Sequence, residues 1–269
     1  ILNLGNGYQA KIGNLKDISL RALETLKEVD VIACEDTRVS IKLLNHYEIK
    51  KPLITYHKFN EQNSAKGIVN LLKEGKNVAV ISDSGMPCIS DPGETLAKLL
   101  VEENIEFTVI PGANAGLSAL ILSGFNSKSF SFIGFLSENK KEKINQIENI
   151  KNFHGSLIFY ISPHNLFKDI SFLNENLGNR KACLVNEITK KFEKKFIFNL
   201  NSPPEIEPRG EYVLVVEGAE DNNENTLNSL SLEEHIHYYL SQGYNKNEAI
   251  KKVGKDRKIK NPYKNIKID

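Results

Sequence analysis

The chain has 269 residues, of which 40% are hydrophobic and 26% are charged. This balance is ordinary for a globular protein and excludes a disordered or fibrous chain, and the length suits about two domains. No apolar run approaches the roughly 20 residues needed to span a bilayer, and residues 1–13 lack the basic front and apolar block of a secretory signal. We therefore expect a cytoplasmic protein.

Metal and disulfide sites are not indicated by the sequence. Cys34, Cys88 and Cys183 are odd in number and far apart, which favours neither a disulfide framework nor a zinc ribbon. The six histidines include no HExxH pattern. We predict buried free thiols and no metal site.

Residues 1–111 alternate short β-rich runs with amphipathic helical runs, a pattern typical of a mostly parallel sheet covered by helices. Buried strands are predicted at 31–34, 53–56, 78–82 and 107–110. Helices with apolar residues three or four apart are predicted at 20–29, 39–46, 65–74 and 95–102. The first predicted domain is thus an α/β domain over residues 1–111.

After Pro111 there are fewer helices per strand, which predicts a mixed α+β second domain over residues 112–218. Its predicted strands are 130–135, 156–161, 182–187, 195–200 and 211–216, and its predicted helices are 115–122, 138–151 and 164–176. Residues 219–230, rich in Asn and acids, are typical of a linker. Helical runs at 232–241 and 246–253, separated by Gly243, predict a small helix-turn-helix-like appendage over residues 231–269.

Charge is divided unevenly near the end of the chain. Residues 217–234 hold six acids and no Lys or Arg, whereas residues 246–269 hold nine Lys or Arg and three acids. A basic segment attracts the phosphates of RNA, although a merely solvated helix end explains it as well. The candidate RNA-binding cations are Lys251, Lys252, Lys255, Arg257, Lys258 and Lys260.

The most informative segment is Ser82-Asp-Ser-Gly-Met-Pro-Cys-Ile-Ser-Asp-Pro-Gly93, which follows a predicted buried strand. Asp91 is predicted to cap the next helix, with Pro92 at its first position and Glu94 closing a capping box. The loop before that cap would expose backbone N–H and C=O groups at the carboxyl end of a strand, where open α/β sheets bind ligands. A stiff connector is the alternative, and the spacing alone does not separate the two.

Two further segments follow predicted strands at the same edge of the sheet. Pro111-Gly-Ala-Asn-Ala-Gly116 enters a helix with little side-chain bulk, so that a ligand can approach closely, with tight helix packing as the alternative. Glu35-Asp-Thr-Arg38 supplies two acids, a hydroxyl and a guanidinium that can abstract a proton or orient a phosphate. A helix start capped by Asp36 or Thr37, with Arg38 solvated or ion-paired, is the other interpretation.

Nucleotide cofactors of two common kinds are disfavoured. No GxxxxGK[ST] pattern occurs, and Gly5-Asn-Gly7 lacks the further glycine and the βαβ context of a dinucleotide-binding fingerprint. His57-Lys-Phe-Asn-Glu61 trails another strand and is a weaker candidate for the same cleft, because one histidine beside a strand end is more often structural.

Taken together, several segments resemble the small-subunit ribosomal RNA methyltransferases of the tetrapyrrole methylase superfamily. The pair of Cys34-Glu-Asp-Thr-Arg38 and the 82–93 loop is the most specific part of this resemblance. The other matching segments are Ile12-Gly-Asn-Leu15, Asp17-Ile-Ser-Leu-Arg-Ala22, Phe59-Asn-Glu61, Pro111-Gly112 and residues 210–218. Their order and spacing extend the resemblance over almost the whole chain.

The resemblance implies a homodimer of two-domain subunits that bind S-adenosylmethionine between the domains. The implied methyl acceptor is the ribose 2′-hydroxyl of a cytidine in the decoding region of 16S rRNA. The implied cofactor-binding residues, acting largely through backbone, are Asp83, Gly85, Met86, Pro87, Ile89, Ala113 and Ala115. The implied acceptor-side residues are Asn14, Glu35, Asp36 and Arg38, with Glu35 or Asp36 as general base and Arg38 on a phosphate.

Two other functions are compatible with the same sequence. A tetrapyrrole or other small-molecule methyltransferase would keep the fold and the cofactor, and the basic end of the chain argues against it. A non-catalytic RNA- or ligand-binding module with an inactive cleft is the third possibility, for which departures from the family's usual residues at Ala10-Lys11, Phe59 and Asn186 leave room.

Overall fold

The computed structural model describes residues 14–57, 60–83, 85–220, 227, 230–257, 259 and 262. The chain forms two compact units, Ile1–Ala219 and Glu220–Asp269. Predictions made for Gly5, Gly7, Ala10-Lys11, Phe59, Lys258 and Lys260 lie outside the described residues. The domain limits predicted at residues 111 and 218 stay predictions.

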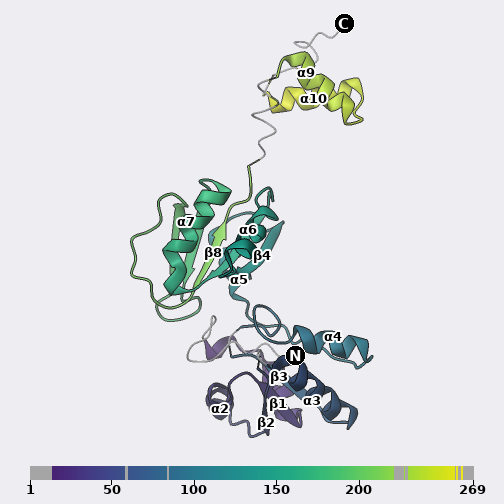
Figure 1. Cartoon of the computed structure of the whole chain (residues 1–269), viewed down its shortest axis with the longest axis vertical. Coiled ribbons are helices and arrows are strands. Elements are labelled where there is room, and N and C mark those ends of the chain that lie inside the picture. The colour runs from purple at the N-terminus through teal and green to yellow at the C-terminus, as the bar shows by residue number, and fades with distance from the viewer. Residues whose placement is uncertain are drawn as a thin grey trace. The chain divides into compact units, whose positions relative to one another are not determined.

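The first sheet is parallel and has the strand order β2-β1-β3. Its strands are β1 (Val31–Cys34), β2 (Leu53–Thr55) and β3 (Val78–Ile81). The helices α1 (Leu20–Glu28) and α2 (Thr37–His46) pack on one face, and α3 (Glu61–Lys73) and α4 (Glu94–Glu102) pack on the other (Figure 1). Because both faces are covered, the central strand β1 is almost continuously apolar, as the sequence predicted.

The prediction of a strand at residues 107–110 is wrong for residues 107–109. Only Ile110 makes a β-bridge, while Phe107 and Val109 remain 42% and 41% exposed. Alternating apolar residues favour a strand, but a strand forms only where another backbone edge supplies hydrogen-bond partners. Residues 107–109 pair with no such edge among the described residues.

The capping box predicted at Asp91 is also wrong. Helix α4 begins at Glu94, and its N-cap residue is Gly93, whose φ of 142° few other residues adopt. A carboxylate oxygen of Glu61, at the start of α3, accepts the backbone N–H groups of Gly93 at 2.9 Å and of Thr95 at 3.3 Å. The first backbone N–H groups of the helix therefore find their acceptor in a side chain distant in sequence, and not in the local cap that was predicted.

The second sheet is mixed and has the strand order β4-β5-β8-β6-β7. Its strands are β4 (Phe130–Phe135), β5 (Ser156–Ile161), β6 (Lys181–Asn186), β7 (Lys194–Asn199) and β8 (Tyr212–Val216). Strands β4 and β5 are parallel, and the other pairs are antiparallel. The helices α6 (Lys140–Glu148) and α7 (Leu166–Leu177) cover one face, and α5 (Ala115–Ser123) covers the other. The predicted combination of a parallel sheet and a mixed α+β region is confirmed.

The predictions for the cysteines and for membrane spans can be compared directly with the structure. All three thiols are free, and Cys34 and Cys183 are buried as predicted. The predicted burial is wrong for Cys88, which is partly exposed in the 82–93 loop. Among the described residues, no helix has both the length and the apolar character needed to cross a bilayer.

The second unit contains the two predicted helices, α9 (Leu232–Ser241) and α10 (Lys246–Asp256), each begun by a capping box. Its core includes a fully buried histidine, His235. The guanidinium of Arg257 donates to His235 Nδ1 at 3.0 Å, and His235 Nε2 lies 3.2 Å from a carboxylate oxygen of Asp256. Because arginine only donates, this ring is neutral, and burial together with Arg257 lowers the pKa of His235.

Candidate functional site

Two turns meet at the carboxyl ends of the neighbouring parallel strands β1 and β3. The backbone N–H of Asp36, just after β1, donates to Asp83 Oδ1, just after β3, at 3.1 Å. The side chain of Asp83 is partly buried, and burial raises the pKa of its carboxyl group. The structure therefore joins the Glu35–Arg38 segment to the 82–93 loop at one edge of the sheet.

Asp36 and Arg38 bind each other. The Asp36 carboxylate caps α2 by accepting the Arg38 backbone N–H at 2.8 Å, and the Arg38 guanidinium donates to both of its oxygens at 2.7 to 3.2 Å. These hydrogen bonds lower the pKa of Asp36 to about 2, and the Arg38 side chain is 87% exposed. A carboxylate so stabilised as an anion is a weak base, so the cap and ion-pair interpretation describes these two residues.

Internal hydrogen bonds hold the conformation of the 82–93 loop. The Ser82 hydroxyl donates to the Gly85 carbonyl at 3.1 Å, and the Ile89 backbone N–H donates to the Met86 carbonyl at 3.1 Å. Left-handed φ values at Gly85, Cys88 and Ser90 turn the backbone sharply. Because the Ile89 N–H already donates a hydrogen bond within the loop, the backbone group of Ile89 that can bind a ligand is its carbonyl.

The small residues at the start of α5 are explained partly by packing. A Cβ atom added to Gly116 would lie 3.2 to 3.3 Å from Phe132 and Ile158 of the second sheet. Asn114 caps α5 by accepting the Leu117 backbone N–H at 3.0 Å. Tight helix packing therefore accounts for Gly116, whereas Ala113 stays partly exposed beside the cap.

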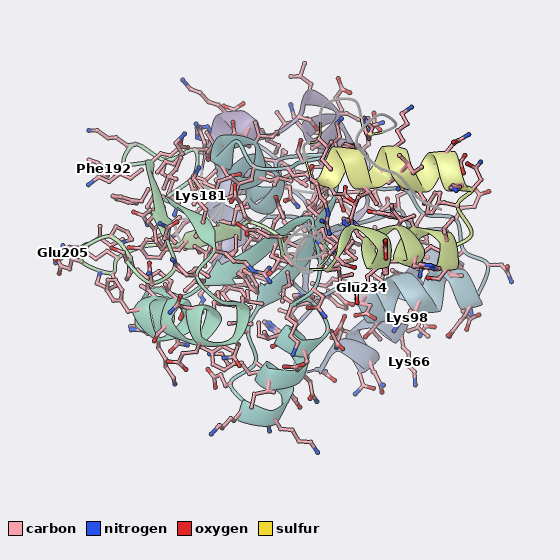
Figure 2. The ribbon with its side chains drawn as sticks, turned by 90° about the horizontal axis from the view of Figure 1, so that it is seen from above. Lys66, Lys98, Lys181, Phe192, Glu205 and Glu234 are labelled. Atoms are coloured by element: carbon pink, nitrogen blue, oxygen red, sulfur yellow. The ribbon has the colours of Figure 1, made fainter. Side chains whose placement is uncertain are left out.

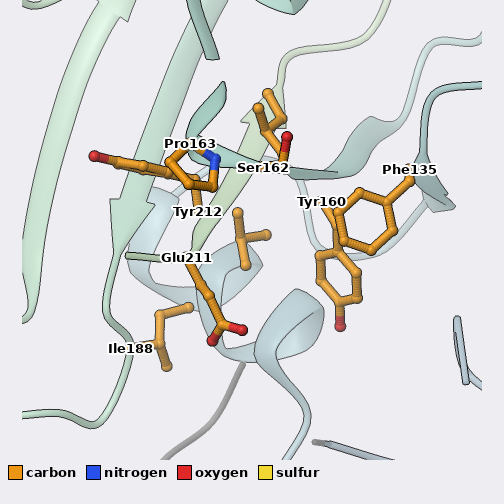
Figure 3. Close-up of a pocket in the computed structure, with 9 residues that line it drawn as sticks. Phe135, Tyr160, Ser162, Pro163, Ile188, Glu211 and Tyr212 are labelled. Atoms are coloured by element: carbon orange, nitrogen blue, oxygen red, sulfur yellow. The ribbon is translucent and has the colours of Figure 1, made fainter. Parts of the chain in front are cut away.

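A cavity of about 150 Å³ lies at the carboxyl ends of β4 and β5 (Figure 3). It is lined by Phe135, Tyr160, Ile161, Ser162, Pro163, Ile188, Glu211, Tyr212 and Val213. Burial and the nearby carboxylates of Asp91 and Glu211 raise the pKa of Tyr160 to about 12. Asp91 belongs to the 82–93 loop, so the charge of this loop acts on a tyrosine that lines the cavity.

Two direct contacts place segments of the first 90 residues against the second sheet. A Cβ atom added to Gly134 of β4 would lie 2.8 Å from the Ser90 hydroxyl oxygen, so the loop touches this strand. The side-chain amide of Asn14 donates to the Thr189 carbonyl at 3.3 Å, in the turn between β6 and β7. Asn14 also caps a short 3₁₀ turn, η1 (Leu15–Asp17).

The turn after β6 is held by a partly buried ion-pair cluster. Glu187 Oε1 accepts from the Lys190 ammonium and from the Glu211 backbone N–H, each at 3.0 Å. The Asn186 amide donates to the carbonyls of Arg209 and Glu211. Asn186 thus joins β6 to the chain before β8, which is a structural role for this departure from the family's usual residue.

Tyr160, Glu211 and Phe135 were missed by the sequence analysis. They lie in or beside strands whose sequence predicts only core residues. They line one cavity only because strands distant in the chain lie next to each other in the sheet. The available signal was a tyrosine hydroxyl within the otherwise apolar run Leu-Ile-Phe-Tyr-Ile of β5, because a buried hydroxyl requires a polar partner.

Comparison with known proteins assigns this arrangement to a family. A model described as Tetrapyrrole (Corrin/Porphyrin) Methylases matches residues 11–204. Ribosomal RNA small subunit methyltransferase I of Bacillus subtilis is 43% identical, over 92% of this chain and 88% of the relative. The protein of the same name from Mycoplasmopsis pulmonis is 49% identical, over 69% of this chain and 83% of the relative. The chain belongs to the ribosomal RNA small subunit methyltransferase I family.

Solved structures agree with this methyltransferase family in fold. Diphthine synthase aligns with a TM-score of 0.64 at 15% identity, covering 81% of this chain and 88% of that one. Uroporphyrin-III-C-methyltransferase from Thermus thermophilus aligns with a TM-score of 0.56 at 19% identity, covering 80% and 92%. The predicted tetrapyrrole-methylase-like fold and methyltransferase class are confirmed, and S-adenosylmethionine is the methyl donor of this class.

Gly210→Ala in this methyltransferase is expected to disturb the cluster around Glu187. Gly210 has a φ of 77°, and an added Cβ atom would lie 2.4 Å from Glu187 Oε1. We expect a loss of about 2 to 5 kcal/mol in the free energy of unfolding, from left-handed strain and overpacking together. Chemical denaturation measures this loss.

Gly124→Ala is the matched control for that experiment. Gly124 is left-handed, with a φ of 70° and a ψ of 10°, and among the described residues no atom lies within 4 Å of the added Cβ. This variant should lose only the strain contribution, about 1 to 2 kcal/mol. Equal losses in the two variants would contradict a steric role for the Glu187 contact.

Proposed function

We propose that this methyltransferase transfers a methyl group from S-adenosylmethionine to the ribose 2′-hydroxyl of a decoding-region cytidine in 16S rRNA. The observation that carries the proposal is the convergence of turns from both sheets. The Asp36–Asp83 hydrogen bond, the Ser90–Gly134 contact and the Asn14–Thr189 hydrogen bond bring these turns together. The names of the relatives supply the class of the acceptor, ribosomal RNA of the small subunit.

The residues at this junction fit S-adenosylmethionine. The carboxylates of Asp83, Asp91 and Glu211 lie at or near the junction, and negative charge suits a sulfonium cation. Among the residues that the structure describes, no atom lies within 4 Å of a Cβ atom added to Gly85, which supports a close approach of the cofactor to the loop backbone there. The proposed binding residues are Asp83, Gly85, Met86, Pro87, Ile89, Ala113 and Ala115. When bound, the cofactor supplies an electrophilic methyl group.

The proposed task of the acceptor side is to hold a ribose oxygen in line with that methyl group and to remove its proton. A ribose hydroxyl is a poor nucleophile while it is protonated, so a positioned carboxylate assists as general base. We assign this role to Glu35 rather than to Asp36, because both oxygens of Asp36 are held by Arg38. Asn14 positions the acceptor side, and exposed Arg38 meets a phosphate.

The second unit is proposed to add nonspecific attraction to RNA phosphates. Lys251 and Lys255 are exposed on α10, and Lys252 lies over the rings of Tyr239 and Tyr244 at 5.2 and 4.5 Å. Arg257 is removed from this role because its guanidinium binds His235 and backbone carbonyls within the unit. Lysines at 251, 252 and 255 therefore carry the proposed attraction in the described part of the appendage.

The proposed assembly is a cytoplasmic homodimer. Leu117 and Ile121 on α5 are 45% and 76% exposed, which supports a further partner on that side of the helix. Sedimentation measurements on the purified chain test this point independently of the reaction.

The test of the function uses the purified protein, labelled S-adenosylmethionine and small ribosomal subunits from cells that lack this modification. We expect label on one ribose of 16S rRNA. Label on a base would overturn the ribose assignment, and label on an added tetrapyrrole but not on RNA would favour the small-molecule alternative.

A further inference from the structure

An exposed aromatic ring and several lysines lie in the turn between β6 and β7. Phe192 is 69% exposed, and Figure 2 shows it projecting outward at the margin of the protein. Residues 190–195 read Lys-Lys-Phe-Glu-Lys-Lys, four cations and one acid. A large apolar ring amid like charges in water is unfavourable unless something covers it.

Hydrogen bonds and ion pairs hold the turn, although its tip is exposed. Glu187 and Thr189 adopt left-handed φ values of 54° and 64°, and the Glu193 carboxylate accepts the Thr189 backbone N–H at 2.7 Å. Lys190 is bound to Glu187 at 3.0 Å and lies 3.5 Å from Glu211. These contacts fix the backbone from which Phe192 projects, so little conformational entropy is lost when a partner binds the ring.

The remaining lysines of the turn differ in what they contact. The Lys191 ammonium lies over the Phe192 ring, 5.6 Å from its centroid, and the Lys195 ammonium donates to the Leu122 carbonyl at 3.1 Å. Lys194 is exposed and makes no ion pair with any residue that the structure describes. Lys191 therefore presents positive charge at the ring, and Lys194 presents it two residues further along the chain, on the same hollow as Phe192.

The turn also adjoins the proposed acceptor side. The Thr189 carbonyl, three residues before Phe192, accepts the side-chain amide of Asn14. A hollow of about 610 Å³ opens beside Phe192 and is lined in part by Glu187, Lys194 and Arg209. A partner seated on Phe192 is therefore close to residues proposed to receive the substrate.

Lysines on a sheet edge have a second explanation. Strand β7 is an edge strand, and charges there prevent pairing with other chains. That explanation covers Lys194 and Lys195, but an exposed phenylalanine at the end of the edge promotes association. An aromatic ring flanked by cations matches instead the chemistry of unpaired RNA, whose bases stack on aromatic rings and whose phosphates bind lysine.

We propose that the β6–β7 turn recognises the RNA substrate, with Phe192 stacked on an unpaired nucleobase and Lys191 and Lys194 on the adjoining phosphates. The proposal rests on the proposed RNA substrate and adds the contact that holds it. It requires no covalent step, and it gives the turn a role in substrate affinity rather than in chemistry.

Phe192→Trp provides a direct reporter of stacking, because the chain contains no tryptophan. Adding a short unstructured RNA oligonucleotide to the full-length variant should quench the indole fluorescence. Heparin, a polyanion without bases, should bind without quenching it. Equal quenching by heparin, or RNA binding without quenching, would overturn the stacking contact.

Substitutions measure the contribution of the turn to affinity. Phe192→Ala should weaken binding of the same labelled oligonucleotide by roughly 5- to 150-fold, while Phe192→Tyr retains most of it. Lys191→Gln and Lys194→Gln should each reduce the slope of log affinity against log salt by about 0.7. Phe167→Ala, which removes a 40% exposed ring from α7, is the matched control and should change neither quantity.

Three outcomes separate this proposal from the proposed function. Binding of S-adenosylmethionine should be unchanged in every variant of the turn. If the wild-type protein binds RNA through Phe192 but methylates no small subunit, only the proposed function fails. If it methylates RNA and Phe192→Ala leaves RNA affinity unchanged, the turn proposal fails, and a smaller sedimenting mass of that variant would assign Phe192 to a contact between copies.

Discussion

Glu35→Gln should lower kcat by about 10²- to 10⁴-fold, the usual contribution of a positioned general base. Glu35 directly follows β1, next to the turn that bonds Asp83, and it is partly buried. Glutamine keeps the size of the side chain and removes its ability to take a proton. Because the substitution leaves the 82–93 loop intact, the affinity for S-adenosylmethionine should change little.

Asp36→Asn is the matched comparison for that experiment. This variant loses the ion pair with Arg38 but keeps a good N-cap residue for α2, so its stability should change little. Its effect on kcat should be well below that of Glu35→Gln. Single-turnover methylation of small subunits measures both variants. Unchanged turnover in Glu35→Gln would remove the carboxylate from the mechanism, and a larger loss in Asp36→Asn would move the role to Asp36.

Asp169→Ala should lower the free energy of unfolding by about 3 to 5 kcal/mol, because it leaves a buried ammonium without its partner. The Lys143 ammonium of α6 lies 2.5 Å from Asp169 Oδ1 of α7, and the two side chains are only 12% and 10% exposed. The same ammonium lies 4.5 Å from the centroid of the Phe172 ring. The ion pair therefore joins the two helices that cover one face of the second sheet.

Two further variants test whether the stability lost in Asp169→Ala comes from the buried charge that it leaves without a partner. Glu94→Ala removes an ion pair with Lys98 whose side chains are 75% and 67% exposed, so water screens the pair and the loss of stability should be far smaller than in Asp169→Ala. Combining Lys143→Met with Asp169→Leu should recover most of the stability lost in Asp169→Ala, since no buried charge remains. Urea unfolding measures all four proteins. Similar losses in Asp169→Ala and Glu94→Ala would contradict the assignment of a buried pair.

The elements were predictable wherever one local pattern determined them. Apolar periodicity located α7 and the fully buried run of β5 to within a few residues, because each packs against a continuous core. Residues 107–110 carried a similar pattern without forming a strand, since a sequence shows the preference of a segment and not whether an edge is available to pair with it.

The candidate site was predictable only in part, for a similar reason. The turns after β1 and β3 could be placed at one edge because parallel strands end together. The capping of α4 by Glu61 and the proximity of Tyr160 to Asp91 join residues 32 to 69 positions apart, and no local spacing indicates them. The same holds for Asn14 and Thr189, whose contact depends on the tertiary fold that brings the β6–β7 turn next to the start of the described chain.

The proposed function depends on one cofactor site formed by turns of both sheets. The most direct test of this site is backbone hydrogen exchange of the full-length protein with and without S-adenosylmethionine. Binding should slow exchange together in the 82–93 loop, at the start of α5, and around Tyr160 and Glu211 of the second sheet. Protection confined to a single one of these segments, with the others unchanged at saturating cofactor, would contradict the convergence on which the proposed function depends.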